Sequence, residues 1–253
     1  MAGYDAIGNI AILKFPDSTK LREKKKQALK LLNENKSIET ILEKIEKVSG
    51  RLRTIKTRLL AGKDTREALY KESGCFFKLN VETCYFSPRL SGERLEIAGK
   101  CSKKDKVLVL FAGVAPFSII IAKLAGSQVV SVELGKECCK YARENVKLNK
   151  LNNIKIIQGD VKKLSKLIQK EKFDKIVMPR PQLKETFLKY IWPFCKPGTL
   201  VFYYDFGKDV SKILKKIEQE AKKAKKKLKI TGFRKAGDIA PYKYRWRIDF
   251  KVS

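Results

Sequence analysis

The sequence contains no histidine, so it lacks the side chain most often used for acid–base catalysis near neutral pH. Triads that need imidazole as their base are excluded, and so are the usual mixed cysteine–histidine zinc sites. The six cysteines show no C-x-x-C spacing, so we expect mostly buried thiols and no metal site; they are Cys75, Cys84, Cys101, Cys138, Cys139 and Cys195. Acid–base chemistry must then use Asp, Glu, Lys, Tyr or Cys.

Long apolar runs and acidic residues are also scarce. No run of about 18 apolar residues is present, and the N-terminus has no signal-peptide pattern. Lys and Arg number 57 against 27 Asp and Glu, which gives a net charge of +30 and a pI near 9.9. We therefore expect a soluble, cytoplasmic protein that binds no membrane and whose positive surface favours a polyanion such as RNA or DNA.

The 253 residues have room for a large α/β domain with a smaller partner, and we place the boundary between residues 98 and 99. In the first part, alternation over 6–15 predicts a strand, and Asp17 and Ser18 precede a Lys-rich helix through about residue 33. The helical spacing of apolar residues over 38–50 predicts a second helix. Short alternating segments over 51–97, broken near Gly62 and Gly74, predict hairpins, so residues 1–98 form a small α+β domain.

Residues 99–253 alternate apolar strands with amphipathic helices. Strands are predicted at 107–111, 129–133, 154–158, 173–178 and 199–205, with helices at 116–124, 137–150, 163–169 and 208–227. This order indicates a doubly wound, mostly parallel sheet. Two late strands, at 229–234 and 245–252, with a turn at Gly237 and Asp238, suggest an antiparallel edge.

Three features at predicted strand ends favour an adenosine-type cofactor when taken together. The loop around Gly113 lies between a strand and a helix, where such sheets place their ligand crevice. Glu133 ends the next strand 20 residues later, where a carboxylate can accept from ribose hydroxyls, and Asp160 follows the strand after that. Each feature alone has a simpler interpretation, as an apolar turn, a helix cap or a solvated charge.

The residues around these features resemble class I S-adenosylmethionine-dependent methyltransferases, in FAGVAPFSI, in VVSVELGKECCKYARENVKLNKLNNIKIIQGDV and in FDKIVMPRP. The upstream segment YFSPRLSGER and the late segment AGDIAPY resemble the archaeal and eukaryotic tRNA (guanine-N1)-methyltransferases, which modify the guanosine 3′ of the anticodon. The resemblance implies a seven-stranded Rossmann-like methyltransferase sheet behind a smaller N-terminal α+β domain. It also implies that the family's additional N-terminal domain, which grips the outer corner of tRNA, is missing.

The resemblance assigns roles to matching positions. Glu93 matches the proposed general base for the guanine N1 proton, and Arg53 the arginine that stabilises charge on O6. Arg94 is expected near the cofactor and Arg89 near the nucleic acid, although a salt-bridged helix start would also explain Arg89, Glu93 and Arg94. The expected cofactor-binding set for S-adenosyl-L-methionine is Arg94, Phe111, Ala112, Gly113, Val114, Pro116, Phe117, Glu133, Leu134, Asp160 and Val161.

Three positions depart from the family pattern. Val109 replaces an acid that many relatives carry, and Ala115 replaces the second loop glycine. Pro179 stands where many relatives have an asparagine that helps to hold the purine, and proline offers no donor. Arg180 or a backbone carbonyl could replace that contact, and the identity of the target base depends on which of these applies.

Basic clusters complete the sequence-based predictions. Twelve Lys and Arg lie between residues 206 and 235, and a second cluster lies over 20–30, which suits either phosphate contacts or a Lys-rich surface. Residues 242–246 interleave aromatic and basic side chains, which suits either a stacked base or an edge strand. We expect a monomer acting on the tRNA anticodon stem-loop. The alternatives are tRNA 3-amino-3-carboxypropyl transfer, as in the wybutosine pathway, and a noncatalytic RNA-binding module.

Overall fold

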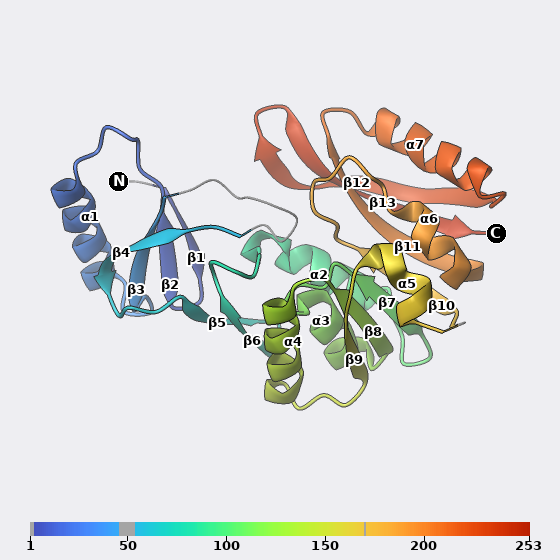
Figure 1. Ribbon diagram of the computed structural model, residues 1–253, viewed down its shortest axis with the longest axis horizontal. Helices are drawn as coiled ribbons and strands as arrows, with labels where there is room; N and C mark the ends of the chain where they lie inside the picture. The colour runs from blue at the N-terminus through green and yellow to red at the C-terminus, as the bar shows by residue number, and fades with distance from the viewer. Residues whose placement is uncertain (1–2, 46–53, 170) are drawn as a thin grey trace. The chain divides into compact units, whose positions relative to one another are not determined.

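The computed structural model describes residues 3–45, 54–169 and 171–253, and its contacts divide the chain into two units, residues 1–88 and 89–253 (Figure 1). The division falls ten residues before the boundary expected from the sequence, since it lies within the PRL turn and the helix after that turn belongs to the second unit. Within the described residues, no helix is long and apolar enough to cross a membrane.

The first unit contains a four-stranded sheet, one helix and a separate hairpin. Its elements are β1 (Tyr4–Ile7), β2 (Ile10–Leu13), α1 (Leu21–Glu34), β3 (Thr40–Lys44), β4 (Thr57–Gly62), β5 (Glu67–Glu72) and β6 (Cys75–Asn80). The sheet order is β1-β2-β3-β4, and α1 connects the parallel pair β2 and β3. Its core joins Ala28 and Leu31 of the helix to Leu13, Ile41 and Leu60 of the sheet.

Three predictions for this unit are wrong. The strand expected over 6–15 is the hairpin β1–β2, because Gly8 turns the chain with φ +56°. The helix expected over 38–50 is strand β3 at Thr40–Lys44, and residues 46–50 lie outside the described residues. Because β3 is interior to the sheet, four successive residues from Thr40 to Glu43 are buried, and such a run cannot be distinguished from a helix by periodicity. The break at Gly62 also forms no hairpin, since β4 pairs with β3 and β5 pairs with β6.

The second unit contains the predicted seven-stranded, mostly parallel sheet. Its strands are β7 (Lys106–Leu110), β8 (Gln128–Glu133), β9 (Ile154–Gln158), β10 (Phe173–Met178), β11 (Cys195–Gly207), β12 (Leu228–Ala240) and β13 (Lys243–Val252). The order is β12-β13-β11-β10-β7-β8-β9, and β13 is antiparallel to both of its neighbours. The antiparallel strand is thus inserted inside the sheet, and the edge strand β12 follows the parallel direction. The expected turn at Gly237 lies within β12, as a register shift, and the chain turns at Pro241 and Tyr242.

Helices cover both faces of this sheet. The helices are α2 (Ser91–Gly99), α3 (Pro116–Ala125), α4 (Lys136–Leu148), α5 (Leu164–Leu167), α6 (Leu188–Ile191) and α7 (Val210–Lys223), with short 3-10 turns at Pro88–Leu90, Val161–Lys163 and Trp192–Phe194. One face, with Leu108, Ile176 and Tyr203, packs against α5, α6 and α7 in a single apolar core. On the other face Ser131 donates or accepts a 2.6 Å hydrogen bond with Ser118 of α3, and Tyr204 meets Phe117. The carboxyl ends of the parallel strands therefore open between two helical layers, where α/β sheets bind ligands.

Gly8 gives a test of the first unit. A Cβ on Gly8 would lie 1.9 Å from the backbone oxygen of Leu69, whereas Gly74 has φ +72° but nothing within 4 Å of such an atom. We expect Gly8→Ala to lower the free energy of unfolding by more than about 2 kcal/mol and Gly74→Ala by about 1 kcal/mol, because only the first adds a backbone clash to the cost of a positive φ. Urea unfolding followed by circular dichroism measures the stability of both variants. Equal losses of stability would contradict the close approach of Gly8 to the backbone of Leu69 in β5.

Candidate cofactor and nucleic-acid site

The loop between β7 and α3 is a strained turn at the carboxyl end of the central strand. Phe111, Gly113 and Ala115 all have positive φ, at 55°, 57° and 67°, although two of them carry side chains. Ala112 donates its amide to Val132 O at 3.1 Å, so the turn is fixed to β8. Non-glycine residues in this conformation persist where the surrounding structure holds them, often at functional sites. The predicted cofactor loop therefore has the backbone form that a close ligand approach requires.

Glu133 joins this loop to the next one. Its Oε2 accepts the amide of Gly113 at 2.8 Å and its Oε1 accepts the amide of Gly135 at 2.7 Å. The side chain is nearly buried, at 9% exposure, and Leu134 beside it is half-buried. Each carboxylate oxygen has two lone-pair sites, so one site on each remains for a further donor such as a ribose hydroxyl. The acid predicted to bind a ligand also organises the two loops that flank the ligand position.

Asp160 and Val161 follow β9 at the same edge of the sheet. Asp160 caps the 3-10 turn after it by accepting the amide of Lys162 at 3.0 Å, and Gly159 donates to Glu133 O at 2.8 Å. Val161 is buried, with 4% exposure, in the core beneath the edge. Two carboxylates, a tight apolar turn and an apolar floor suit the ribose and base of an adenosine-containing cofactor. These are the residues that could hold S-adenosyl-L-methionine.

Asn145 supports the loop between β7 and α3, although no sequence motif pointed to this residue. This buried side chain of α4 donates its Nδ2 to Val114 O at 3.2 Å. Its place on the inward face of an amphipathic helix could have indicated this role, because a buried amide side chain usually forms a hydrogen bond with a backbone group. Asn145 thus holds the cofactor loop from the helix side, opposite Glu133.

Glu93 of the PRLSGER segment is buried in the first turn of α2, with 3% exposure. Its Oε2 accepts hydrogen bonds from the Tyr204 hydroxyl at 2.8 Å and from Arg247 Nη1 at 2.9 Å. Its Oε1 accepts no hydrogen bond from the described residues, although Arg234 Nη2 lies 2.7 Å away at ion-pair distance. The carboxylate is therefore ion-paired through both oxygens, with the buried Arg247 on one and the half-exposed Arg234 on the other.

Two aromatic contacts bring this acid to the cofactor loop. The Tyr204 and Phe117 ring centroids are 6.0 Å apart, and the Arg94 guanidinium lies 5.9 Å from the Phe117 ring. Phe117 is in the first turn of α3, directly after the Gly113 loop. Arg94, at 1% exposure, is the most deeply buried charged side chain of the segment. Arg94 therefore lies against the Phe117 ring at the start of α3, and Glu93 is connected to the same ring through Tyr204.

Arg247 organises the charges around Glu93. It also donates to Glu96 at 2.5 Å and to Asp249 at 2.9 Å, and it is almost fully buried. The Arg247 hydrogen bond lowers the pKa of Glu96 to about 2. Burial, and then the charge of Glu93, raise the pKa of Tyr204 well above its usual value, so Tyr204 stays protonated as a donor. Strand β13 thus supplies the counter-charge that a buried carboxylate on α2 needs.

Arg53 lies outside the described residues, and Arg89 is exposed in the 3-10 turn before α2. Pro179 follows the last residue of β10 and is half-buried. Arg180 is 2% exposed, pairs with Asp205, and donates Nη1 to the carbonyls of Leu183 and Glu185 at 2.9 and 3.1 Å, while its buried Nε donates to none of the described residues. Arg180 therefore fixes the loop after β10.

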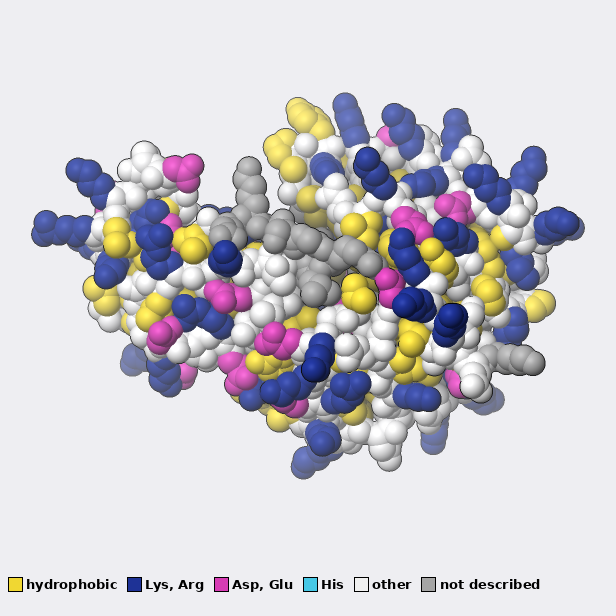
Figure 2. All heavy atoms as spheres, in the orientation of Figure 1, with side chains coloured by type: hydrophobic (Ala, Val, Ile, Leu, Met, Phe, Trp, Pro, Cys, Tyr) yellow, Lys and Arg dark blue, Asp and Glu magenta, His cyan; other side chains and the backbone are white. Residues whose placement is uncertain are grey.

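Lys and Arg side chains cover much of the face seen in Figure 2, with few Asp and Glu among them. Helix α7 buries only Ile213, Ile217 and Ala221, so most of its lysines point to solvent. No disulfide joins the six cysteines, five of which are buried, and the described residues contain no group of His, Cys, Asp or Glu that could hold a metal ion.

The chain matches known protein families and curated relatives in sequence. Residues 68–230 match the TRM5/TYW2 methyltransferase domain, and residues 1–65 match the TYW2 N-terminal domain. A tRNA (guanine(37)-N(1))-methyltransferase, Trm5b of Pyrococcus abyssi, is 34% identical over 99% of this chain and 74% of its own length. A tRNA(Phe) (4-demethylwyosine(37)-C(7)) aminocarboxypropyltransferase of Methanocaldococcus jannaschii is 29% identical over 80% of this chain and 77% of its own length.

Solved structures agree with these matches. The crystal structure of Pyrococcus abyssi Trm5b has a TM-score of 0.87 to this chain, covering 99% of it and 75% of the crystallised chain. A complex of aTrm5 with tRNALeu has a TM-score of 0.86 at 28% identity, covering 99% of this chain and 72% of that one. The expected fold class is confirmed: a Rossmann-like methyltransferase sheet that follows an α+β unit along the chain.

Asn145 gives a test of the cofactor loop. We expect Asn145→Ala to weaken S-adenosylmethionine binding about tenfold, because the buried Val114 carbonyl loses its donor and the loop is no longer held. Asn153→Ala is the matched control, since Asn153 donates Nδ2 to Ala122 O and Ser127 O at the other end of α3. Calorimetry with both variants measures the effect, and equal cofactor affinities would remove Asn145 from the site.

Proposed function

Because the chain belongs to the TRM5/TYW2 methyltransferase family, we propose that this enzyme transfers a methyl group from S-adenosyl-L-methionine to N1 of the guanosine 3′ of the anticodon in tRNA. The observation that carries the proposal is the buried Glu93 carboxylate beside the cofactor loop, whose Oε1 is covered, among the described residues, only by the half-exposed side chain of Arg234. When bound, S-adenosylmethionine supplies an electrophilic methyl group.

The cofactor would be held at the carboxyl edge of the sheet. Glu133 would accept from the ribose hydroxyls, and Asp160 would face the adenine side, with Leu134 and Val161 as apolar walls. Arg94 stands near the start of α3, where a cation suits the carboxylate of the methionine part. The amide of Gly113 is already occupied by Glu133, so the loop is set before any ligand arrives.

Glu93 would take the N1 proton of guanine. N1 lies on the Watson–Crick edge, so the base must leave its stack before the enzyme can reach it. Oε1 is the acceptor available for that proton, and access to it requires Arg234 to move. The Arg234 side chain is 49% exposed on the edge strand, so it can move at little cost, while Arg247 and Tyr204 keep Oε2 in place. Arg53 would stabilise charge on O6, a role carried over from the family resemblance.

The positive surface would position the RNA. A net charge of +30 provides the field for phosphate contacts, which orient tRNA without reading its sequence. Arg89, exposed just before α2, is one candidate for such a contact. A monomer that works on tRNA in the cytoplasm is part of the same proposal.

A second candidate is transfer of the 3-amino-3-carboxypropyl group of the same cofactor to tRNA. Two observations favour it: the match of residues 1–65 to the TYW2 N-terminal domain, and Pro179 in place of the purine-binding asparagine. Product mass distinguishes the two reactions, since methylation and aminocarboxypropylation add groups of different mass. The noncatalytic alternative predicts no product at all.

Glu93→Gln tests the proposed base. We expect kcat for 1-methylguanosine formation to fall about 10²- to 10⁴-fold, because an amide cannot accept the proton, while S-adenosylmethionine binding is kept. Glu96→Gln is the matched control, since Glu96 lies on the same helix and binds the same Arg247 and Arg234. Mass spectrometry of digested, initially unmodified tRNA provides the measurement. Activity retained in Glu93→Gln would exclude Glu93 as the base.

Pro179→Asn tests the departure at the end of β10. If the target is guanine, an asparagine there adds one hydrogen bond to the base and should raise kcat/KM for tRNA about three- to tenfold. Pro181→Asn, two residues further along the loop, is the control expected to give no gain. Steady-state kinetics on tRNA with guanosine at the target position checks this, and an unchanged kcat/KM would mean that residue 179 does not face the base.

A further inference from the structure

The β12–β13 hairpin has two chemically different faces. Arg234 and Arg247, which pair across the strands, point toward Glu93 on α2. On the opposite face Lys235 pairs with Trp246, and Phe233 and Tyr244 lie two residues away on the same side. We call these four residues the hairpin patch: Phe233, Lys235, Tyr244 and Trp246. The patch lies beside the sheet core that contains Ile248, near the residues that precede α7.

The patch combines aromatic rings with lysine. The Trp246 ring centroid is 6.4 Å from that of Phe233 and 6.0 Å from that of Tyr244. Lys235 Nζ lies 3.7 Å from the Tyr244 ring centroid. Trp246 is anchored by its indole N–H, which donates to Gly207 O at 3.1 Å, whereas Phe233 is 53% exposed. Trp246 and Tyr244 are half-buried, and Trp246 packs partly against the sheet core, so a core role explains part of this cluster but not the exposed Phe233 ring.

The tip of the hairpin adds a strained and exposed tyrosine. Tyr242 has φ +57°, a conformation that favours glycine, and it is 73% exposed, with Lys208 Nζ 5.6 Å from its ring centroid. A bulky side chain that is both strained and exposed contributes nothing to the core. Strained non-glycine residues cluster at functional sites, which makes Tyr242 a candidate contact residue.

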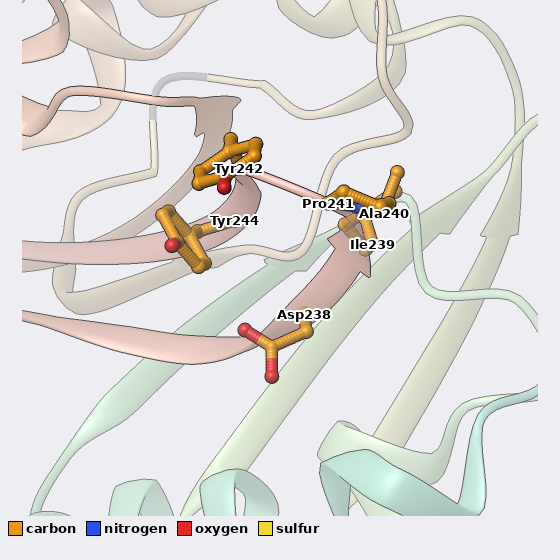
Figure 3. Close-up of a pocket in the computed structure, with 6 residues that line it drawn as sticks. All are labelled: Asp238, Ile239, Ala240, Pro241, Tyr242 and Tyr244. Atoms are coloured by element: carbon orange, nitrogen blue, oxygen red, sulfur yellow. The ribbon is translucent and has the colours of Figure 1, made fainter.

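The tip also borders a shallow, open hollow of about 420 Å³ (Figure 3). The two tyrosine rings lie on one side of it and Ile239, Ala240 and Pro241 on the other, with Asp238 at the strand end. A carboxylate at this position disfavours a phosphate but can accept from the amino group of a nucleobase. The chemistry of the hollow therefore suits a base, while the lysines around it suit the backbone.

The hairpin tip lies at the ligand-binding edge of the sheet. β12 runs in the direction of the parallel strands, so its carboxyl end at Ala240 is on the same edge as Gly113 and Glu133. In the strand order, β13 is two strands from β10, which Pro179 follows, and three from β7, which precedes Gly113, so the hairpin is about 10 to 14 Å from the crevice along the edge at the usual strand spacing. A nucleotide neighbouring the one in the crevice can bridge that distance.

We propose that the hairpin tip, with Tyr242 and Tyr244, is a stacking site for an unpaired nucleotide of the tRNA substrate that is close in sequence to the target base. The proposal rests on the proposed tRNA substrate. Aromatic rings stack with any base, and lysines beside them bind its phosphates. A protein partner is the other occupant an exposed aromatic surface could take, but the lysines over the rings and the net charge of +30 favour RNA.

Tyr242→Gly is the decisive variant, because it removes the ring and relieves the backbone strain, so the fold is not compromised. We expect its dissociation constant for an anticodon stem-loop RNA to rise about tenfold, with an unchanged salt dependence, because stacking releases no counterions. Tyr242→Phe keeps the ring and should bind as the wild type does. Leu148→Ala removes an exposed apolar side chain elsewhere on the same unit, at the end of α4, and should also bind normally. Fluorescence anisotropy over a salt series measures all four proteins, without turnover.

Three results would overturn the proposal: Tyr242→Gly within about twofold of the wild type, an equal loss in Tyr242→Phe, or a shallower salt dependence, which would indicate a phosphate contact. A loss confined to Tyr242→Gly at constant salt slope supports it. Failure of the proposed function is distinguishable, because it appears as wild-type protein that forms no 1-methylguanosine, or that does not bind the stem-loop RNA at all.

Discussion

The buried ion pair between Glu93 and Arg247 is the interaction on which the second unit depends most. Both side chains are 3% exposed, and a charge buried to this degree needs an opposite charge beside it. Glu93, Glu96 and Asp249 are balanced by Arg247, Arg234 and Lys100, three acids against three bases. This network fixes α2 on the sheet, and it also keeps an ionisable acid beside the cofactor loop.

The same arrangement connects the two functional regions of the unit. Arg234 and Arg247 on one face of the β12–β13 hairpin hold Glu93, while Lys235 and Tyr244 on the other face form the hairpin patch. A nucleotide that binds the hairpin would therefore contact the same strands that position Glu93, the proposed general base. At the other end of the sheet edge, Glu133 and Asn145 fix the loop around Gly113 from two sides. Rigid supports of this kind keep a site in place before its ligands bind.

Much of the second unit was predictable because its parallel strands are short apolar runs bounded by polar residues. Strand β10 occupies the predicted residues, and the loop at Gly113 and the acid Glu133 stand at strand ends as expected. The first unit was harder, because the interior strand β3 is buried on both faces and has helical spacing by coincidence. The turn of the last hairpin was misplaced because Tyr242 occupies a left-handed position that a glycine usually marks.

The sequence by itself determined the alternation of strands and helices, the absence of imidazole chemistry and the family motifs, since these depend on residue type and spacing along the chain. Only the tertiary structure decided the partners of buried charges. Arg180 had the chemistry of a base-binding donor, but folding turned it toward Asp205 and the carbonyls of its own loop. Arg247 and Glu93 are 154 residues apart, and no local pattern links them. Their contact exists because β13 is inserted into the sheet beneath α2, and a buried carboxylate must find an opposite charge there.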